Sequence, residues 1–123
     1  MLRHILCLSI LISISSVLHA QSKVSIEGEW LVADLDNSTV IFYKGKDEYW
    51  YSKILKSDNA VYLNQVIYKG KFNRDNSYLE GIFTTPKSKM NINTKVYLDN
   101  VHQMRFVGKK FFITKTYIGK RVK

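Results

Sequence analysis

The feature that most constrains the fold is an alternation of apolar and polar residues that runs through most of the chain after residue 27. In the stretch 92–98, Ile92, Val96 and Leu98 share one face, opposite Asn93 and Lys95. A period of two is the pattern of a β-strand with one buried face, and no stretch carries a convincing 3.6-residue helical period. Strand-like runs occur at 28–34, 38–44, 47–55, 59–72, 78–83, 92–98, 101–107 and 110–118.

Short turn signals separate these runs. Most contain Asp, Asn, Ser or Gly, and the turns expected late in the chain are the Pro86–Lys89 loop, Asp99-Asn100 and Gly108-Lys109. Connections this short cannot hold the crossovers that parallel strands need, so consecutive strands should pair antiparallel. The sequence therefore predicts an all-β fold, an eight-stranded antiparallel up-and-down β-barrel, with a two-sheet β-sandwich as the alternative.

Residues 1–20 have the pattern of a signal peptide. A short basic head precedes an apolar run, Ile5 to Leu18, that is shorter than the ~20 residues needed to span a bilayer. Cleavage near Ala20 would remove Cys7, the only cysteine, and leave residues 21–123 as a single domain. We expect a secreted or periplasmic protein, and an uncleaved N-terminal anchor is the alternative.

Four stretches carry a resemblance to a known family. They are Gly28-Glu29-Trp30, YSKIL at 51–55, Gly81-Ile82-Phe83 leading to Pro86, and TKTYIGKRV at 114–122. Together they resemble a bacterial family of small secreted proteins of unknown function, with a lipocalin-like (calycin) barrel.

The resemblance implies a plug at the barrel floor. In the lipocalin arrangement a Gly-x-Trp enters the first strand, and a cation near the end of the last strand packs over the indole. Carried over to this chain, the plug is Gly28, Trp30 and Arg121, with Lys120 as the other candidate cation. The family implies a fold and an export route, and it does not identify a ligand.

The side-chain inventory argues against catalysis. After residue 20 the chain has one histidine, His102, no cysteine and no Gly-x-Ser-x-Gly motif. A zinc site would need three or four His, Cys or acidic ligands, and the calcium-like start at Asp34 and Asp36 lacks the glycine and glutamate that complete such a loop. We expect no enzymatic activity, no metal and no cofactor.

The barrel interior is the remaining candidate for a binding site. Small eight-stranded barrels either fill their lumen with side chains or hold one ligand. The aromatic residues that could do either are Trp30, Phe42, Trp50, Tyr62, Phe83, Phe106 and Phe112. The first functional hypothesis is an exported, non-catalytic carrier of a small apolar or amphipathic ligand. Its expected lumen residues are Trp30, Phe42, Trp50, Phe83 and Phe106.

The charge of the chain supports a second hypothesis. The formal net charge is +9, and no acidic residue follows Asp99. A filled barrel whose basic C-terminal hairpin gathers its cations on one face would bind anionic lipid or polysaccharide of the cell envelope. The cations in question are Lys109, Lys110, Lys115 and Lys120. Lysines scattered to keep sheet edges from pairing are the simpler explanation.

A nucleic-acid partner is not expected. The mixture of basic and aromatic strands is also typical of oligonucleotide-binding barrels. Those barrels have five strands, however, and export would separate this protein from nucleic acid.

Overall fold

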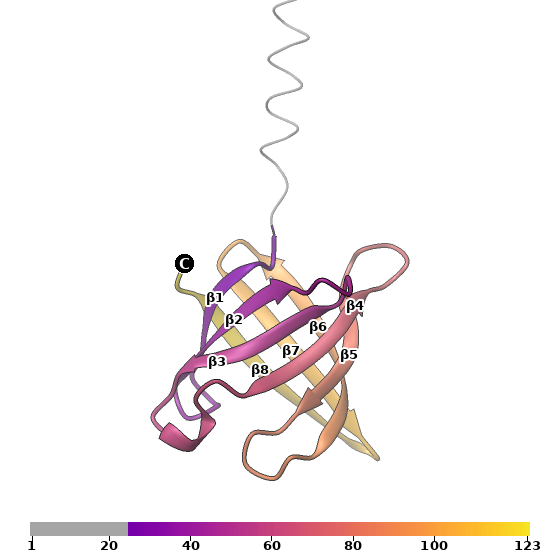
Figure 1. Ribbon diagram of the computed structural model, residues 1–123. Helices are drawn as coiled ribbons and strands as arrows, with labels where there is room; N and C mark the ends of the chain where they lie inside the picture. The colour runs from indigo at the N-terminus through magenta and orange to yellow at the C-terminus, as the bar shows by residue number, and fades with distance from the viewer. Residues whose placement is uncertain (1–24) are drawn as a thin grey trace, which may run out of the picture.

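A computed structural model describes residues 25–123 of the chain. The expected signal peptide and its cleavage site lie outside the described residues. The strands are β1 (Gly28–Val32), β2 (Ser38–Lys44), β3 (Trp50–Lys56), β4 (Val66–Phe72), β5 (Leu79–Thr84), β6 (Asn91–Asn100), β7 (Gln103–Lys110) and β8 (Ile113–Arg121) (Figure 1). A single-turn 3₁₀ helix, η1 (Ala60–Tyr62), lies between β3 and β4. Within the described part, no helix is long and apolar enough to cross a membrane.

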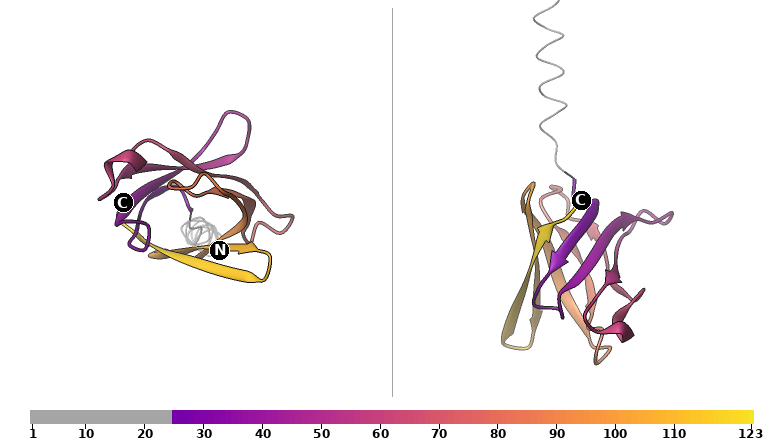
Figure 2. Two further views of the ribbon diagram at one scale, coloured as in Figure 1. Left: turned by 90° about the horizontal axis from the view of Figure 1, so that it is seen from below. Right: turned by 90° about the vertical axis from the view of Figure 1, so that its left-hand side faces the viewer.

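The strands form one closed barrel. Each strand pairs antiparallel with the next, and β1 also pairs with β8, so the sheet returns on itself (Figure 2, left). The ladder between β1 and β8 joins Trp30 to Arg121, Leu31 to Lys120 and Val32 to Gly119. The prediction of an eight-stranded antiparallel up-and-down barrel is confirmed, and closure excludes the two-sheet sandwich.

The connections fall at two ends of the barrel. The β1–β2, β3–β4, β5–β6 and β7–β8 connections lie at the end that we call the open end (Figure 1, bottom). The β2–β3, β4–β5 and β6–β7 connections lie at the opposite end, together with Ser25 and the C-terminus, and we call this the floor end.

Alternate side chains of each strand point into the barrel and form its core. Val40 and Phe42 of β2, for example, are fully buried, as the period of two predicts. Strand β4 departs from this rule, because Ile67 and Tyr68 are neighbours and both are buried. The register between β3 and β4 shifts beside Ser52, and the extra residue of this bulge turns a second side chain inward.

Several sequence-based boundaries were wrong; Asp99 and Asn100, expected as a turn, are the last residues of β6, and two further cases have a clear physical reason. The run 59–72 is a strand only from Val66, because the Asn59 side chain accepts a hydrogen bond from the Val61 amide at 3.1 Å and caps η1. The last turn is at Phe111-Phe112 rather than at Gly108-Lys109. Gly108 lies within β7, and a Cβ there would come within 3.1 Å of side-chain atoms of β6. This glycine therefore relieves crowding inside the barrel and does not make the turn.

The buried hydroxyl of Ser52 provides a test of the core. Ser52 is fully buried between Phe42 and Tyr68 in the ladders, and its Oγ has no hydrogen-bond partner among the described residues. We expect Ser52→Ala to raise the free energy of unfolding by about 1 kcal/mol, because an unpaired buried hydroxyl is costly. Urea denaturation measures the change.

Ser38→Ala is the matched control. The Ser38 hydroxyl is equally buried, but it donates its one hydrogen to Leu35 O and lies 2.9 Å from the hydroxyl of Ser57. Its removal should lower the free energy of unfolding by about 1 kcal/mol. A loss of stability in Ser52→Ala of the same size as in Ser38→Ala would contradict the assignment.

Candidate functional site

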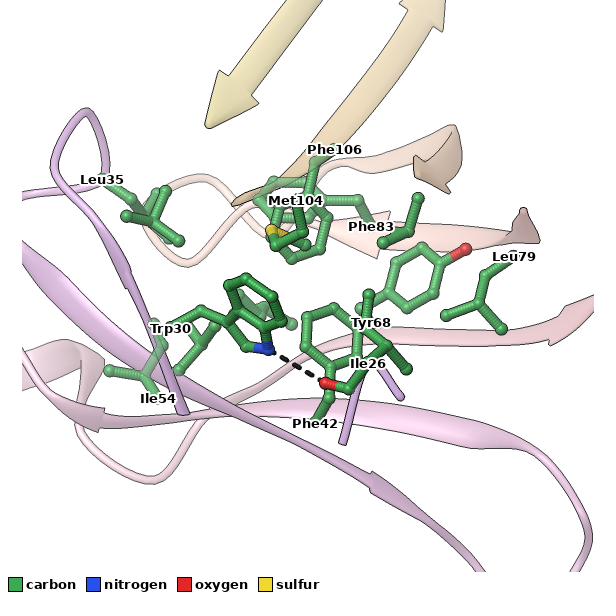
Figure 3. Packing of buried hydrophobic residues seen from close by; sticks show 14 of the residues in the cluster. Ile26, Trp30, Leu35, Phe42, Ile54, Tyr68, Leu79, Phe83, Met104 and Phe106 are labelled. Atoms are coloured by element: carbon green, nitrogen blue, oxygen red, sulfur yellow. Dashed lines mark hydrogen bonds between the residues drawn. The ribbon is translucent and has the colours of Figure 1, made fainter. Parts of the chain in front are cut away.

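A stacked pair of side chains closes the floor end. Trp30 is fully buried, and its indole N–H donates to the Ile26 carbonyl at 2.9 Å (Figure 3). Arg121 stands opposite Trp30 in the β1–β8 ladder, and its guanidinium carbon lies 4.1 Å from the centroid of the indole ring. A cation at this distance over a buried indole is attracted by the ring face.

The same guanidinium holds three chain segments together. Its Nε donates to Val101 O at 2.6 Å, Nη1 to Glu27 O at 3.1 Å, and Nη2 to Ser25 O at 2.6 Å. Gly28 lies beside it with φ 128°, where a Cβ would approach Arg121 Nη1 to 2.9 Å. The structure therefore brings Gly28, Trp30 and Arg121 together at one point. Lys120 is exposed and bonds to Gln103, away from the indole.

Aromatic rings fill the middle of the barrel. The ring centroids of Phe42 and Phe106 are 5.5 Å apart, those of Tyr68 and Phe106 5.8 Å, and those of Phe83 and Phe106 5.6 Å (Figure 3). The Tyr68 hydroxyl donates to the Thr94 carbonyl at 3.0 Å, and burial raises the pKa of this tyrosine. These four rings form a layer between the floor and the open end, and the lumen is not one continuous channel.

A hollow of about 430 Å³ lies beyond this layer at the open end, and we call it the cup. Phe83, Phe106 and Tyr117 line its base, and Ile92 and Ile113 line its wall. All of its lining comes from β5 to β8 and from the β5–β6 and β7–β8 connections. Its volume and its apolar wall match those of small-molecule sites, which span about 300–1,000 Å³.

Two lysines supply cationic groups to the cup. Lys110 and Lys115 both line it, and Lys115 stands across the ladder from Gly108. The Lys115 ammonium lies 4.9 Å from the centroid of the Tyr117 ring, and hydrogen bonding to the Tyr117 hydroxyl raises the pKa of Lys115. The ammonium is therefore charged at neutral pH.

The other half of the open end is packed. Leu35 of the β1–β2 connection and Tyr62 of η1 are buried in the core cluster. The two connections are joined by a hydrogen bond from the Asp58 amide to Asp36 O at 3.0 Å. The hollow is therefore confined to the β5–β8 side of this end.

The five expected lumen residues fall in different places. Phe83 and Phe106 line the cup, Phe42 belongs to the central ring layer, and Trp30 is in the floor. Trp50 lines a second hollow of about 420 Å³ at the floor end, and it meets Phe72 edge-on at 6.0 Å.

Phe112 and the four hairpin lysines also differ from expectation. Phe112 is fully exposed and does not enter the barrel. Lys109 lines a groove on the outer surface of β5–β8, because it is one residue out of phase with Lys110. Lys120 bonds to Gln103 near the floor end, so the four lysines do not gather on one face.

Sequence reasoning missed several cup residues. Met90, Ile92, Ile113 and Tyr117 line the cup but were not among the predicted site residues. The alternation in 92–98 and 110–118 groups Ile92 with Val96 and Leu98, and Ile113 with Tyr117, on one face of each strand, so part of the signal was present. The pattern does not show which of the inward-pointing side chains line a hollow.

The described residues 25–123 contain no group of three His, Cys, Asp or Glu side chains placed to hold a metal ion. Comparison of the chain with protein-family models, with curated proteins and with solved structures finds no match. The resemblance to a secreted bacterial family therefore stays a prediction.

Replacing Arg121 tests the floor. We expect Arg121→Met to lower the free energy of unfolding by about 2 kcal/mol or more. The substitution removes three hydrogen bonds that the charged guanidinium donates, and it removes the contact with the Trp30 indole. Chemical denaturation followed by tryptophan fluorescence measures the change. Lys120→Met, on the neighbouring exposed residue, is the control and should change stability far less. Equal losses in the two variants would refute the role of the guanidinium.

Proposed function

We propose that this is an exported, non-catalytic binding protein that holds a small apolar or amphipathic molecule in the cup. The cup itself carries the proposal: it is a hollow of about 430 Å³ with aromatic and aliphatic walls, at the end of the barrel opposite the Trp30 floor. Sites of this size with few polar groups are typical of small-molecule binding.

The polar lining favours an anionic head group on the ligand. Lys110 and Lys115 are the charged residues of the cup, and its other polar side chains are hydroxyls of Thr85, Thr94 and Tyr117. The segments 81–98 and 100–123 contain no acidic residue. An apolar chain against Phe83 and Phe106, with a carboxylate or phosphate near Lys115, satisfies both parts of the lining.

The same lining supports binding over catalysis. No carboxylate, imidazole or thiol is among the residues that form the cup in the described chain. General acid–base chemistry near neutral pH depends mainly on such groups. The predicted signal peptide and the resemblance to secreted proteins support a location outside the cytoplasm or in the periplasm.

Native mass spectrometry of the exported, purified protein tests the proposal directly. We expect a bound small molecule whose mass contribution disappears after denaturing organic extraction and returns on incubation with a saturated single-chain carboxylate such as dodecanoate. The proposal is refuted if the native protein shows only the mass of its polypeptide before extraction, and again after incubation with a mixture of fatty acids and lipids.

A charge placed in the wall of the cup should weaken binding. Ile113 lines the cup and is 73% exposed, so Ile113→Asp should fold normally. We expect dodecanoate to bind at least about tenfold more weakly, because a carboxylate would oppose both the apolar chain and the anionic head. Isothermal titration calorimetry measures the affinity.

Ile118→Asp is the matched control. Ile118 lies on the same strand, is exposed, and pairs with Arg105 in the ladder, on the outer face. Its replacement should leave the affinity unchanged. If both variants lose affinity equally, or if neither does, the ligand is not held in the cup.

A further inference from the structure

The β7–β8 turn carries two aromatic residues that turn geometry does not favour; Phe111 also lines the cup, and Phe112 does not. Phe111 is 84% exposed and Phe112 is 100% exposed, and Ile113 beside them is also exposed. Two-residue hairpin turns favour Asn and Gly, because these residues tolerate positive φ. Phe111 has φ 57°, a left-handed conformation that costs folding energy for an aromatic residue. The chain thus exposes two large rings in a turn that small residues would make more stably.

Cations surround this turn. Lys109 and Lys110 precede it, and Lys115 follows it on β8. The β5–β6 connection reaches the same end of the barrel and adds Lys87 together with the exposed Met90 (Figure 2, right). We call these residues, with Phe111 and Phe112, the basic tip.

The two connections of the basic tip carry charges of one sign. Besides the hydrogen bond to Tyr117, Asp34 from across the open end acts on Lys115 and helps to raise the pKa of its ammonium group. The β5–β6 and β7–β8 connections carry no acidic residue, while the acids of the open end lie on the β1–β2 and β3–β4 connections. Those acids are Asp34, Asp36 and Asp58. A partner that contacts the basic tip alone should therefore be negatively charged and should also offer an apolar layer for the rings.

We propose that the basic tip docks on an anionic lipid bilayer, with Phe112 entering the interface and the lysines facing lipid phosphates. Aromatic side chains favour the bilayer interface, and each lysine near an anionic surface adds to the attraction. An anionic polysaccharide matches the lysines but has no apolar layer for the two rings. Two copies of the tip would repel each other through their shared charge, which disfavours self-association through this surface.

This inference goes beyond ligand binding, although the basic tip shares Met90, Lys110, Phe111 and Lys115 with the cup. Phe112 does not line the cup, so its role in docking can be tested with the cup intact. Because the cup opens beside the tip, a docked barrel would present the cup to the membrane, which is where single-chain amphiphiles reside.

Vesicle sedimentation tests the docking surface. We expect the protein to bind vesicles of phosphatidylcholine with phosphatidylglycerol, to bind pure phosphatidylcholine weakly, and to lose affinity as salt rises from about 50 to about 500 mM. Phe112→Ser should reduce binding about tenfold, because one ring no longer leaves water. Phe112→Trp should keep the affinity, and dodecanoate binding should be unchanged in both variants.

Val101→Ser is the matched control. Val101 is an exposed apolar residue in the β6–β7 turn at the floor end, and its replacement should leave vesicle binding unchanged. Circular dichroism checks that every variant is folded. The inference is overturned if Phe112→Ser binds vesicles as the wild type does, or if Val101→Ser loses as much. It is also overturned if the wild type binds an anionic polysaccharide in preference to anionic vesicles, or if Phe112→Ser instead dissociates a dimer.

Discussion

The contact between the Arg121 guanidinium and the Trp30 indole is the interaction on which the rest of the structure depends. It lies where the first and last strands meet, and the ladder between them has only three residue pairs. The guanidinium also bonds to the carbonyls of Ser25, Glu27 and Val101. Closure is what removes the unpaired edges of an antiparallel sheet. With no cysteine after residue 20, closure depends on such noncovalent contacts.

Because the floor end is closed, the position of any ligand site depends on how the rest of the lumen is filled. The buried indole blocks the floor, and the ring layer of Phe42, Tyr68, Phe83 and Phe106 fills the middle. Space for a ligand is then left at the ends, and the cup is the hollow where aromatic walls and cations meet. The basic tip lies at this same end. Both proposals therefore concern the open end of the barrel, and the role of the floor end is structural.

Local sequence patterns predicted the number and pairing of the strands well. They failed for features that depend on contacts with strands distant in the sequence. Alternation and short turns were enough for strand number and pairing, and the Trp30–Arg121 contact was anticipated from a resemblance. The turn was placed at Gly108 because glycine is a turn residue, yet Gly108 lies inside β7, where a Cβ would come within 3.1 Å of side chains of β6, and the turn is at Phe111-Phe112. The bulge that buries Ile67 likewise has no local signal. Whether an inner ring fills the lumen or lines a hollow depends on neighbours from other strands.

The most direct test of the account is an NMR titration of the labelled protein with dodecanoate, which locates the ligand residue by residue. We expect the amide shifts to concentrate at Ile92, Gly108, Ile113 and Lys115, while the Trp30 indole signal stays in place. Shifts centred on the floor-end hollow beside Trp50, or no shifts at a saturating ligand concentration, would contradict the claim that the cup is the binding site.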